Sequence, residues 1–423
     1  MTALLSGLII LPALAAVALV LFVRSSSGAL RMSQIVTAIA MVCALLLLPF
    51  GTQDLQLQFG WLPSFGDWSL TVGGVGLYAL LITVACALLT RFAASDEPAS
   101  PTAEAVYLIA LAASNAAFLS GHFLARYVAL EVVALCVAIA TLVALHHELG
   151  ARAAGFVYLL FRIGDVGLLA AILLLFQATG TLAIGDTLQI GMSLIGPRSV
   201  WIAVALILSI WVKAGAWPFH SWLRVGAALG LRSRSWLYGV LMPSLGFYLL
   251  YRVAPLLTAS ISRSLIVSLG LGVAVVATLV VVRGQEVGRV LLYGNTAVAG
   301  LALASVGGGV TAGVVGLLIV TAPIRLWLWR REDTQTLQPA FLAEGRVIAR
   351  DVSLDAGEGE VFRHKPVKTA ERWGGDGLVS LVGNGVVSIG RWFSALHTGH
   401  LRAGLAWILV SLTVALAVVW LVL

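Results

Sequence analysis

Apolar runs of about 20 residues recur along almost the whole chain, and each is long enough to cross a lipid bilayer as a helix. Of the 423 residues, 60% are hydrophobic and only 11% are charged, whereas soluble domains carry roughly 25% charged residues. Because lipid offers no hydrogen-bond partners to a backbone, such runs must form helices. The sequence therefore predicts an all-α, polytopic membrane bundle of about twelve transmembrane helices.

Hydropathy places these spans along most of the chain, with one long polar interruption near the C-terminus. We expect them at 3–23, 33–50, 69–91, 104–120, 123–146, 153–178, 199–222, 235–255, 262–282, 287–306, 308–329 and 402–423. Between the last two spans, apolar residues of 373–397 recur at three- and four-residue spacing. That stretch predicts an amphipathic helix lying along the membrane, with a loosely ordered linker as the alternative.

The net charge of +7 is explained by membrane topology rather than by nucleic-acid binding, because the basic residues lie in loops between apolar runs. The loops after the odd-numbered spans hold Arg24, Arg31, Arg91, Arg152, Arg224, Arg232, Arg234, Arg283, Arg330 and Arg331. By the positive-inside bias these loops are cytoplasmic. Both termini are then expected outside, in a bacterial-type cytoplasmic (inner) membrane.

A lysine inside one apolar span is the first candidate functional residue. Lys213 lies in the seventh span, five residues before Pro218. A buried charge at that depth is costly and usually functional, and a proline interrupts the helix. We interpret Lys213 as part of an ion path and expect a break at 214–218. The alternative is a lysine that extends its amine to the membrane interface.

Three further ionisable residues stand out within apolar spans, namely Glu131, Arg162 and Asp165. Arg162 and Asp165 are three residues apart, so they share a helix face and can pair. We expect Glu131 and Lys213 to face each other, directly paired or bridged by water, as a switchable proton site. A static salt bridge that fixes helix packing is the alternative. His220, just past the break, either relays protons or caps the broken backbone.

Nothing in the sequence supports soluble-enzyme chemistry. It shows no metal-ligand cluster, phosphate-binding loop, nucleophile elbow or CxxC motif. The three cysteines lie within apolar segments and are interpreted as small buried hydrophobes. We therefore expect neither a cofactor nor a metal, and any electron transfer is expected elsewhere in a larger complex.

Four motifs, in order along the chain, resemble signatures of one family. They are Leu130–Cys136 (W-E-G-V-G-L-C), Phe161–Gly167 (N-R-[IV]-G-D-x-G), Lys213–Leu223 (G-K-S-A-Q-x-P-L-H-x-W-L) and Glu286–Tyr293 (D-x-K-R-x-L-A-Y). Together they resemble the proton-translocating, antiporter-like membrane subunits of complex I, nearest the distal L subunit. Mrp antiporter subunits and the membrane subunit of inorganic-carbon uptake complexes are related. Ala395–Gly404 also resembles the stretch that leads into the last helix of the L subunit.

The resemblance implies a fold and an organisation. The family's fold is two inverted five-helix repeats, each with a broken helix. It implies N-terminal transmembrane helices (1–103), a first repeat (104–257), a second, truncated repeat (258–330), a cytoplasmic linker (331–372), an amphipathic membrane-parallel segment (373–400) and a terminal span (401–423).

The resemblance also implies roles for residues. Glu131 and Lys213 match the family's ion-pair glutamate and central lysine, and Arg162 and Asp165 match its modulating pair. Where the family has a lysine late in the second repeat, this chain has Arg325 or no counterpart. Other family positions are changed here, with Gly316 and Val320 in place of histidines, Tyr238 in place of a further histidine and Arg224 in place of an aspartate.

Two functions follow from this resemblance. The first is an ion-translocating membrane subunit of a complex-I-like NADH/quinone oxidoreductase or a related multi-subunit redox complex. It would work in the lipid bilayer with other membrane and peripheral subunits, and it would move protons or, alternatively, sodium ions. The second is a degenerate antiporter-like subunit of an inorganic-carbon (CO2/bicarbonate) uptake complex, or a scaffold that does not pump. The kept charged residues favour the first function, and the lost histidines favour the second.

Overall fold

The computed structural model of the chain describes residues 2–51, 55–62, 66–94, 97, 100–145, 147–227, 229–283 and 287–331. All of them belong to one compact unit, Met1–Ala349. The amphipathic segment expected at 373–400 and the terminal span expected at 401–423 lie outside the described residues, as does nearly all of the linker.

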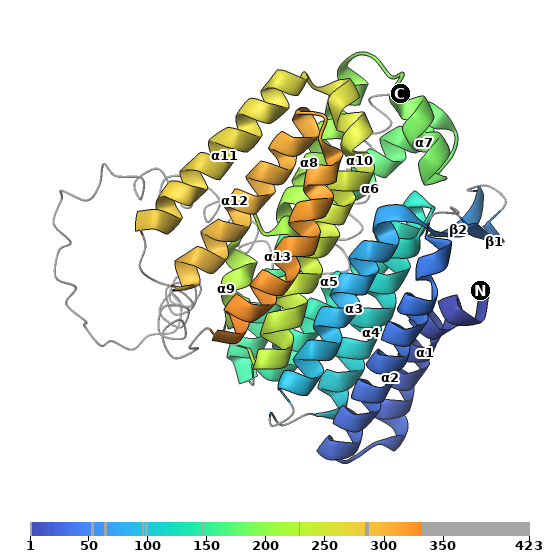
Figure 1. Ribbon diagram of the computed structural model, residues 1–423, viewed down its shortest axis with the longest axis vertical. Coiled ribbons are helices and arrows are strands. Elements are labelled where there is room, and N and C mark those ends of the chain that lie inside the picture. The colour runs from blue at the N-terminus through green and yellow to red at the C-terminus, as the bar shows by residue number, and fades with distance from the viewer. Residues whose placement is uncertain are drawn as a thin grey trace, which may run out of the picture. The chain divides into compact units, whose positions relative to one another are not determined.

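Helices dominate the described part of the chain (Figure 1). They are α1 (Thr2–Phe22), α2 (Ser26–Leu46), α3 (Gly74–Ala93), α4 (Pro101–Leu119), α5 (Phe123–Ala144), α6 (His147–Thr179), α7 (Ile184–Gly191), α8 (Pro197–Ala214), α9 (Ser221–Ala227), the π-helix η2 (Ser233–Leu241), α10 (Met242–Ser260), α11 (Arg263–Arg283), α12 (Val287–Gly307) and α13 (Thr311–Arg331), with a short 3₁₀ turn η1 (Leu48–Phe50). Within the described residues, eleven helices are long and apolar enough to cross a membrane. The all-α membrane bundle predicted from hydropathy is therefore confirmed.

Local signals explain where several helices begin. Ser25 accepts a hydrogen bond from the Gly28 amide (3.2 Å) at the start of α2, and Ser100 accepts one from the Ala103 amide (3.0 Å) at the start of α4. Serine is a favoured N-cap because its oxygen satisfies an amide that has no partner in the first turn. Pro101 follows as the first residue of α4, where its missing N–H costs nothing.

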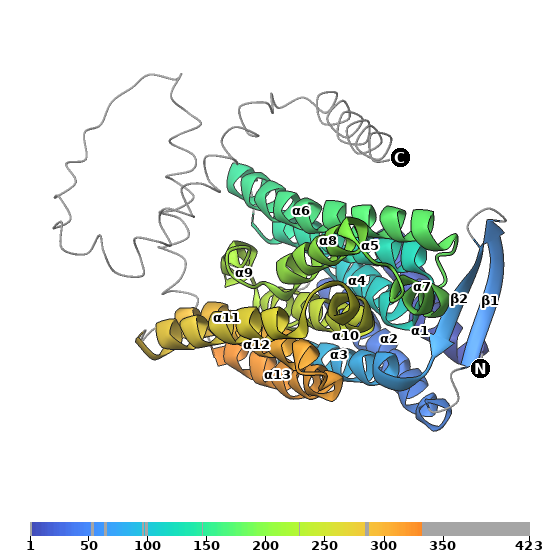
Figure 2. The ribbon, with the colours of Figure 1, turned by 90° about the horizontal axis from the view of Figure 1, so that it is seen from above.

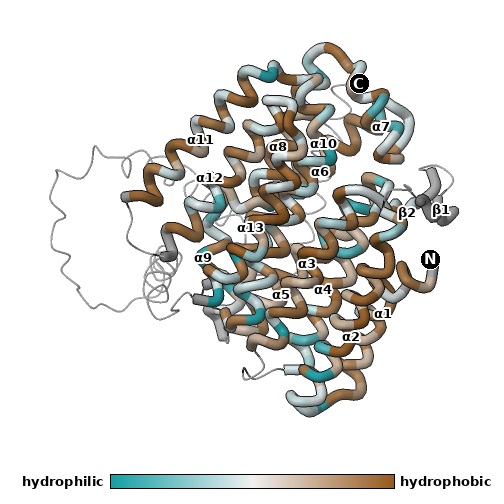
Figure 3. The backbone as a smooth tube through the Cα atoms, viewed as in Figure 1, coloured by the Kyte–Doolittle hydropathy of each residue, from teal (hydrophilic) through white to brown (hydrophobic). Residues whose placement is uncertain are grey.

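The outer surface of the bundle is apolar, as a lipid-facing surface requires. On α11, Val276 is 62% exposed and Val282 is 77% exposed, and on α1 Val20 is 61% exposed. Hydrophobic residues cover most of the helices, and hydrophilic ones gather mainly near their ends and between them (Figure 3). Large exposed apolar surfaces are rare on soluble monomers, so this distribution agrees with a polytopic membrane protein.

A small β-hairpin was not predicted from the sequence. Strands β1 (Leu55–Leu62) and β2 (Gly66–Val72) pair antiparallel, with Leu57 opposite Leu70. The Gly121 amide donates to the Ser69 carbonyl (2.8 Å), which ties β2 to the extended residues between α4 and α5. The hairpin and the short helix α7 lie in segments too short or too polar to register as spans, so hydropathy alone does not reveal them.

Helix α8 occupies a central position. It packs against α6 on one side and against α10 and α12 on others, and the view from above places α8 between α6 and α10 (Figure 2). Two helices of the second half, α12 and α13, also pack against each other, and α13 packs against α10 and η2. A charged residue near the end of α8 is thus enclosed by helices that precede α8 in the chain and by helices that follow it.

Candidate functional site

Helix α8 ends at Ala214 and the chain does not resume a helix until Ser221. Gly215 has left-handed backbone angles (φ 66°, ψ 38°). Its amide donates to the Val212 carbonyl and that of Ala216 to the Trp211 carbonyl, both at 3.1 Å. This pair of bonds is a Schellman motif, for which glycine is the favoured residue. The break predicted at 214–218 is therefore confirmed.

Neighbouring side chains satisfy the backbone groups that the break exposes. The indole of Trp222 donates to the Val212 carbonyl (3.0 Å), and that of Trp211 donates to the Trp217 carbonyl (2.8 Å). From α12, Asn295 donates its amide to the Ala214 carbonyl, and Thr296 accepts from the Trp217 amide (3.0 Å). A non-helical segment at membrane depth persists only where protein or water supplies such partners.

Lys213, the next-to-last residue of α8, has a side chain that is 0% exposed. Its ammonium group forms an ion pair with Asp165 on α6, whose side chain is 1% exposed. Asp165 also pairs with Arg162 one turn earlier on α6 (3.1 Å), as their spacing predicts. Arg162 in turn pairs with Glu131 on α5. The four charged side chains are therefore linked in series, Glu131–Arg162–Asp165–Lys213, and we call this series the charge chain.

The ion partners differ from the expected ones. The sequence predicts a pair between Glu131 and Lys213, direct or through water. The structure instead pairs each of them with a residue of α6, so Arg162 and Asp165 stand between the two. The physical reason is that α6 lies next to both α5 and α8, so its charges reach both partners.

Two glycines on α6 allow α6 and α8 to approach each other closely. A Cβ on Gly164 would lie 2.9 Å from the Val212 Cβ, and one on Gly167 would lie 2.9 Å from the Ala205 carbonyl oxygen. Any larger residue would push α6 and α8 apart. The glycines thus bring Asp165 within reach of Lys213.

The charge chain runs from a partly accessible end to a buried end. The side chains of Arg162 and Glu131 are 28% and 14% exposed, whereas those of Asp165 and Lys213 are enclosed. The charge chain holds two carboxylates and two cations, so its formal charge is zero. Such pairing is what allows charges to remain inside a bundle.

The other two predicted site residues lie outside the charge chain. His220 is buried in the segment between α8 and α9, and its ring contacts that of Tyr293 (5.2 Å between centroids). Arg325 is buried on α13, where it donates to Asn295 (3.3 Å) and Ser244 (3.4 Å). Both roles predicted for His220, relay and cap, stay predictions.

A second buried charge cluster was not predicted from the sequence. Glu104 on α4 forms ion pairs with Arg91 of α3 (2.6 Å) and with Arg232 just before η2 (2.9 Å), and Arg232 also reaches Glu97 (3.4 Å). The sequence signal that could have revealed this cluster is an acidic residue, Glu104, within an otherwise apolar span.

Two polar residues at the break were not predicted either. Asn295 and Thr296 are adjacent in an otherwise apolar stretch of α12. Their position inside a span could have indicated a contact with another helix, because a buried polar group needs a hydrogen-bond partner.

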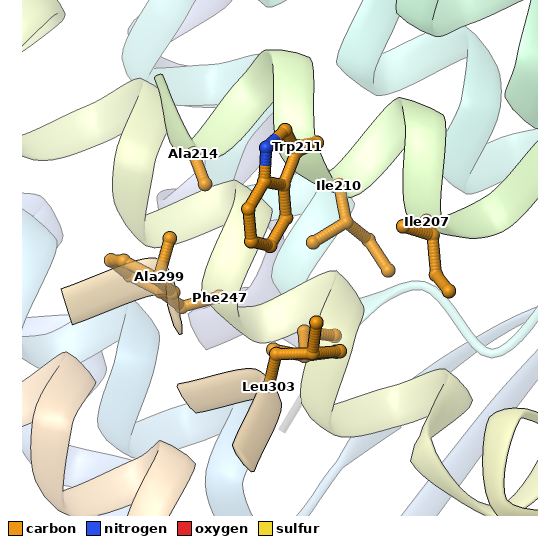
Figure 4. Close-up of a pocket in the computed structure, with 8 residues that line it drawn as sticks. Ile207, Ile210, Trp211, Ala214, Phe247, Ala299 and Leu303 are labelled. Carbon is orange, nitrogen blue, oxygen red and sulfur yellow. The ribbon is translucent and has the colours of Figure 1, made fainter. Parts of the chain in front are cut away.

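A narrow apolar crevice lies on the side of α8 that faces α10 and α12 (Figure 4). Its lining comes from Ile207, Ile210, Trp211, Ala214, Phe247, Leu250, Ala299 and Leu303. None of these residues is charged, so this side of α8 provides packing, while the charge chain lies toward α6.

Residues 120–322 match the family model described as NADH:quinone oxidoreductase/Mrp antiporter, transmembrane. This range, just under half of the chain, is similar to the transmembrane domain of that family. The matched range includes the whole charge chain and His220, and Arg325 lies just beyond it. The family resemblance drawn from the four motifs is thereby confirmed.

Relatives of known family agree with this assignment. NADH-quinone oxidoreductase subunit L of Campylobacter jejuni is 26% identical over 192 residues, which are 45% of this chain and 32% of that protein. A component of a probable K(+)/H(+) antiporter of Rhizobium meliloti is 25% identical over 70% of this chain and 31% of its own length. The chain thus spans about a third of the length of these relatives.

Similarity to solved structures extends over most of the chain. A chain of the Mrp complex from Dietzia sp. DQ12-45-1b has a TM-score of 0.67 and 19% identity, covering 78% of this chain and 36% of that one. A chain of respiratory complex I from Thermus thermophilus has a TM-score of 0.65 and 19% identity, covering 77% and 71%. At this identity the likeness establishes the fold, which is that of an antiporter-like membrane subunit.

Proposed function

We propose that the chain is an ion-translocating membrane subunit, with the proton as the favoured ion, of a complex-I-like NADH/quinone oxidoreductase or a related multi-subunit complex. The observation that carries the proposal is the enclosed Lys213–Asp165 ion pair at the break in α8. Other membrane and peripheral subunits are its proposed partners. The proposed location is a bacterial-type inner membrane with both termini outside, on the basis of the loop arginines.

The charge chain suggests how an ion could be moved. Arg162 contacts the carboxylates of both Glu131 and Asp165. A change of charge near the partly accessible Glu131 would strengthen or weaken the hold of Arg162 on Asp165. Asp165 would then hold Lys213 less or more firmly, because a carboxylate shared between two cations stabilises each of them less. Lys213 could in this way keep or release a proton.

Proton transfer suits these groups better than sodium binding does. Sodium and similar hard cations need several oxygen ligands, whereas both carboxylates of the charge chain are already paired with cations. A lysine amine binds and releases protons but does not coordinate sodium. His220 and Arg325 are proposed to belong to the same pathway.

A second candidate function is a scaffold, or a subunit that supports uptake of inorganic carbon without pumping. The observation favouring it is Arg325 in the second half, together with Gly316 and Val320 where the family has histidines. Arginine stays protonated at physiological pH and so cannot release a proton. In this second function the charge chain is a static structural feature.

Ion transport by the purified, reconstituted complex tests the proposal. Lys213→Ala should abolish ion-coupled activity and leave assembly intact, because Asp165 keeps Arg162 as a partner (3.1 Å). Ser209→Ala is the matched control, since Ser209 is also buried on α8, one turn before Lys213. Near-normal transport by Lys213→Ala would favour the scaffold instead.

A further inference from the structure

Helix α12 contacts the break in α8 through two adjacent polar residues, Asn295 and Thr296, which are 6% and 2% exposed. Asn295 donates to the Ala214 carbonyl, and Thr296 accepts from the Trp217 amide (3.0 Å). The two bonds therefore lie on either side of Gly215 and Ala216. Together they hold the beginning and the middle of the non-helical segment to the same helix.

The side-chain amide of Asn295 also joins α13 to the break. Its oxygen accepts from Arg325 Nη1 (3.3 Å), while its nitrogen donates to the Ala214 carbonyl. A guanidinium group only donates and a carbonyl only accepts, so the two partners fix the orientation of the amide. Asn295 is therefore a bridge between Arg325 and the residue that follows Lys213.

Arg325 needs such a bridge because its charge is buried. Within the described ranges its side chain contacts neutral groups: Asn295, Ser244 (3.4 Å) and the face of the Phe247 ring (5.3 Å). A buried charge is costly unless polar groups solvate it. Moving Asn295 away from Arg325 therefore costs free energy, which couples the position of α13 to that of the bridge.

We propose that Asn295 is a positioning residue that fixes the Lys213 end of α8 to α12 and α13. An amide does not titrate at neutral pH, so this bridge conveys position rather than protons. Thr296 strengthens the same attachment through the Trp217 amide. A displacement of α12 or α13 would thus reach the break and, through Ala214, the lysine beside it. The consequence for transport rests on the proposed function, but the attachment itself does not.

Hydrogen–deuterium exchange of the full chain, in its purified complex, tests the attachment. Asn295→Leu and Thr296→Val should each speed exchange of the amides at 215–217 by about fivefold, since one net hydrogen bond is worth about 1 kcal/mol. Thr296→Ser keeps the hydroxyl and should restore the slow exchange. The control is Thr278→Val on α11, whose hydroxyl bonds to its own helix at Ala274 (2.7 Å). That variant should leave 215–217 unchanged.

Double variants separate positioning from general loosening. If Asn295 acts together with Arg325, then adding Arg325→Met to Asn295→Leu should speed exchange at 215–217 little further. If the two residues act independently, their effects on exchange should add. Unchanged exchange at 215–217 in Thr296→Val and in Asn295→Leu would overturn the proposal. Should Asn295→Leu fail to assemble, the nearly isosteric Thr296→Val still decides the result.

Failure of the attachment and failure of the proposed function are distinguishable on the same samples. Faster exchange in the Asn295 and Thr296 variants, with normal transport by Lys213→Ala, would keep the attachment and reject ion translocation. Unchanged exchange with lost transport in Lys213→Ala would do the reverse.

Discussion

Lys213 on α8 and Asp165 on α6 form an ion pair between side chains that are 0% and 1% exposed. The two residues of this pair differ in how many oppositely charged partners they have. Asp165 has a second cation, Arg162, at 3.1 Å. Within the described residues, Asp165 is the one carboxylate that pairs with Lys213. The pair is therefore asymmetric, and removing its two members should have different consequences.

Removing the carboxylate should destabilise the protein more than removing the lysine. Asp165→Asn leaves the Lys213 ammonium buried without its anion, and breaking a buried pair in this way costs about 3–5 kcal/mol. Lys213→Met leaves Asp165 paired with Arg162, so its cost should be smaller. Thermal unfolding of the purified complex compares the two. When Asp165→Asn and Lys213→Met are combined, their losses of thermal stability should not add. Strict additivity would show that the two residues do not stabilise each other.

The distance between α6 and α8 is set by Gly164. Gly164→Ala would place a Cβ 2.9 Å from that of Val212, and overpacking of this kind costs about 1–3 kcal/mol. It should also weaken the Lys213–Asp165 pair and lower ion transport. Gly155→Ala is the control on the same helix, since a Cβ there meets nothing within 4 Å.

Relief of the clash provides the complementary measurement. Val212→Ala removes the two γ carbons of Val212, which lie 3.1 and 3.4 Å from the position of the new methyl group, and leaves the Cβ at 2.9 Å. It should recover part of the thermal stability and part of the transport lost in Gly164→Ala. If Gly164→Ala behaves like Gly155→Ala in both assays, close approach of α6 and α8 does not depend on the glycine.

The helices could be predicted from the sequence, but the pairing of charges could not. A span needs only about 20 apolar residues, which is local information. The partner of Lys213 lies 48 residues away on another helix, and four ionisable residues in three spans allow several pairings. Burial costs require that each charge be compensated, but they do not select the partner. The arrangement of α5, α6 and α8 does so.

The hydrogen bonds that attach the break in α8 to α12 could not be predicted from the sequence either. Pro218 and Gly215 predicted where α8 ends, because both act on their own backbone. Asn295 and Thr296 lie 81 and 79 residues further along the chain than the backbone groups to which they bond. A polar pair inside an apolar helix indicates a buried contact, yet it does not reveal which backbone groups it serves.

Glu104 should prove more important for stability than Glu97, although both contact Arg232. Glu104→Gln removes the anion that Arg91 and Arg232 share, and the Arg91 side chain is 1% exposed. Its expected cost is about 3–5 kcal/mol. Glu97 is 31% exposed, so solvent compensates much of the loss in Glu97→Gln. Thermal unfolding of both variants measures the difference, and equal losses would contradict it.

Lys213→Arg separates the presence of a charge from the ability to release it. Arginine keeps a cation beside Asp165, so assembly and thermal stability should stay close to those of the unmodified complex. Arginine remains protonated at physiological pH, so a pathway in which this residue gives up its proton should stop. We expect ion transport in reconstituted vesicles to fall as far as in Lys213→Ala, while the two variants differ in the charge they leave behind. If Lys213→Arg transports ions normally and Lys213→Ala does not, the residue supplies a fixed charge, and proton release must occur at another group.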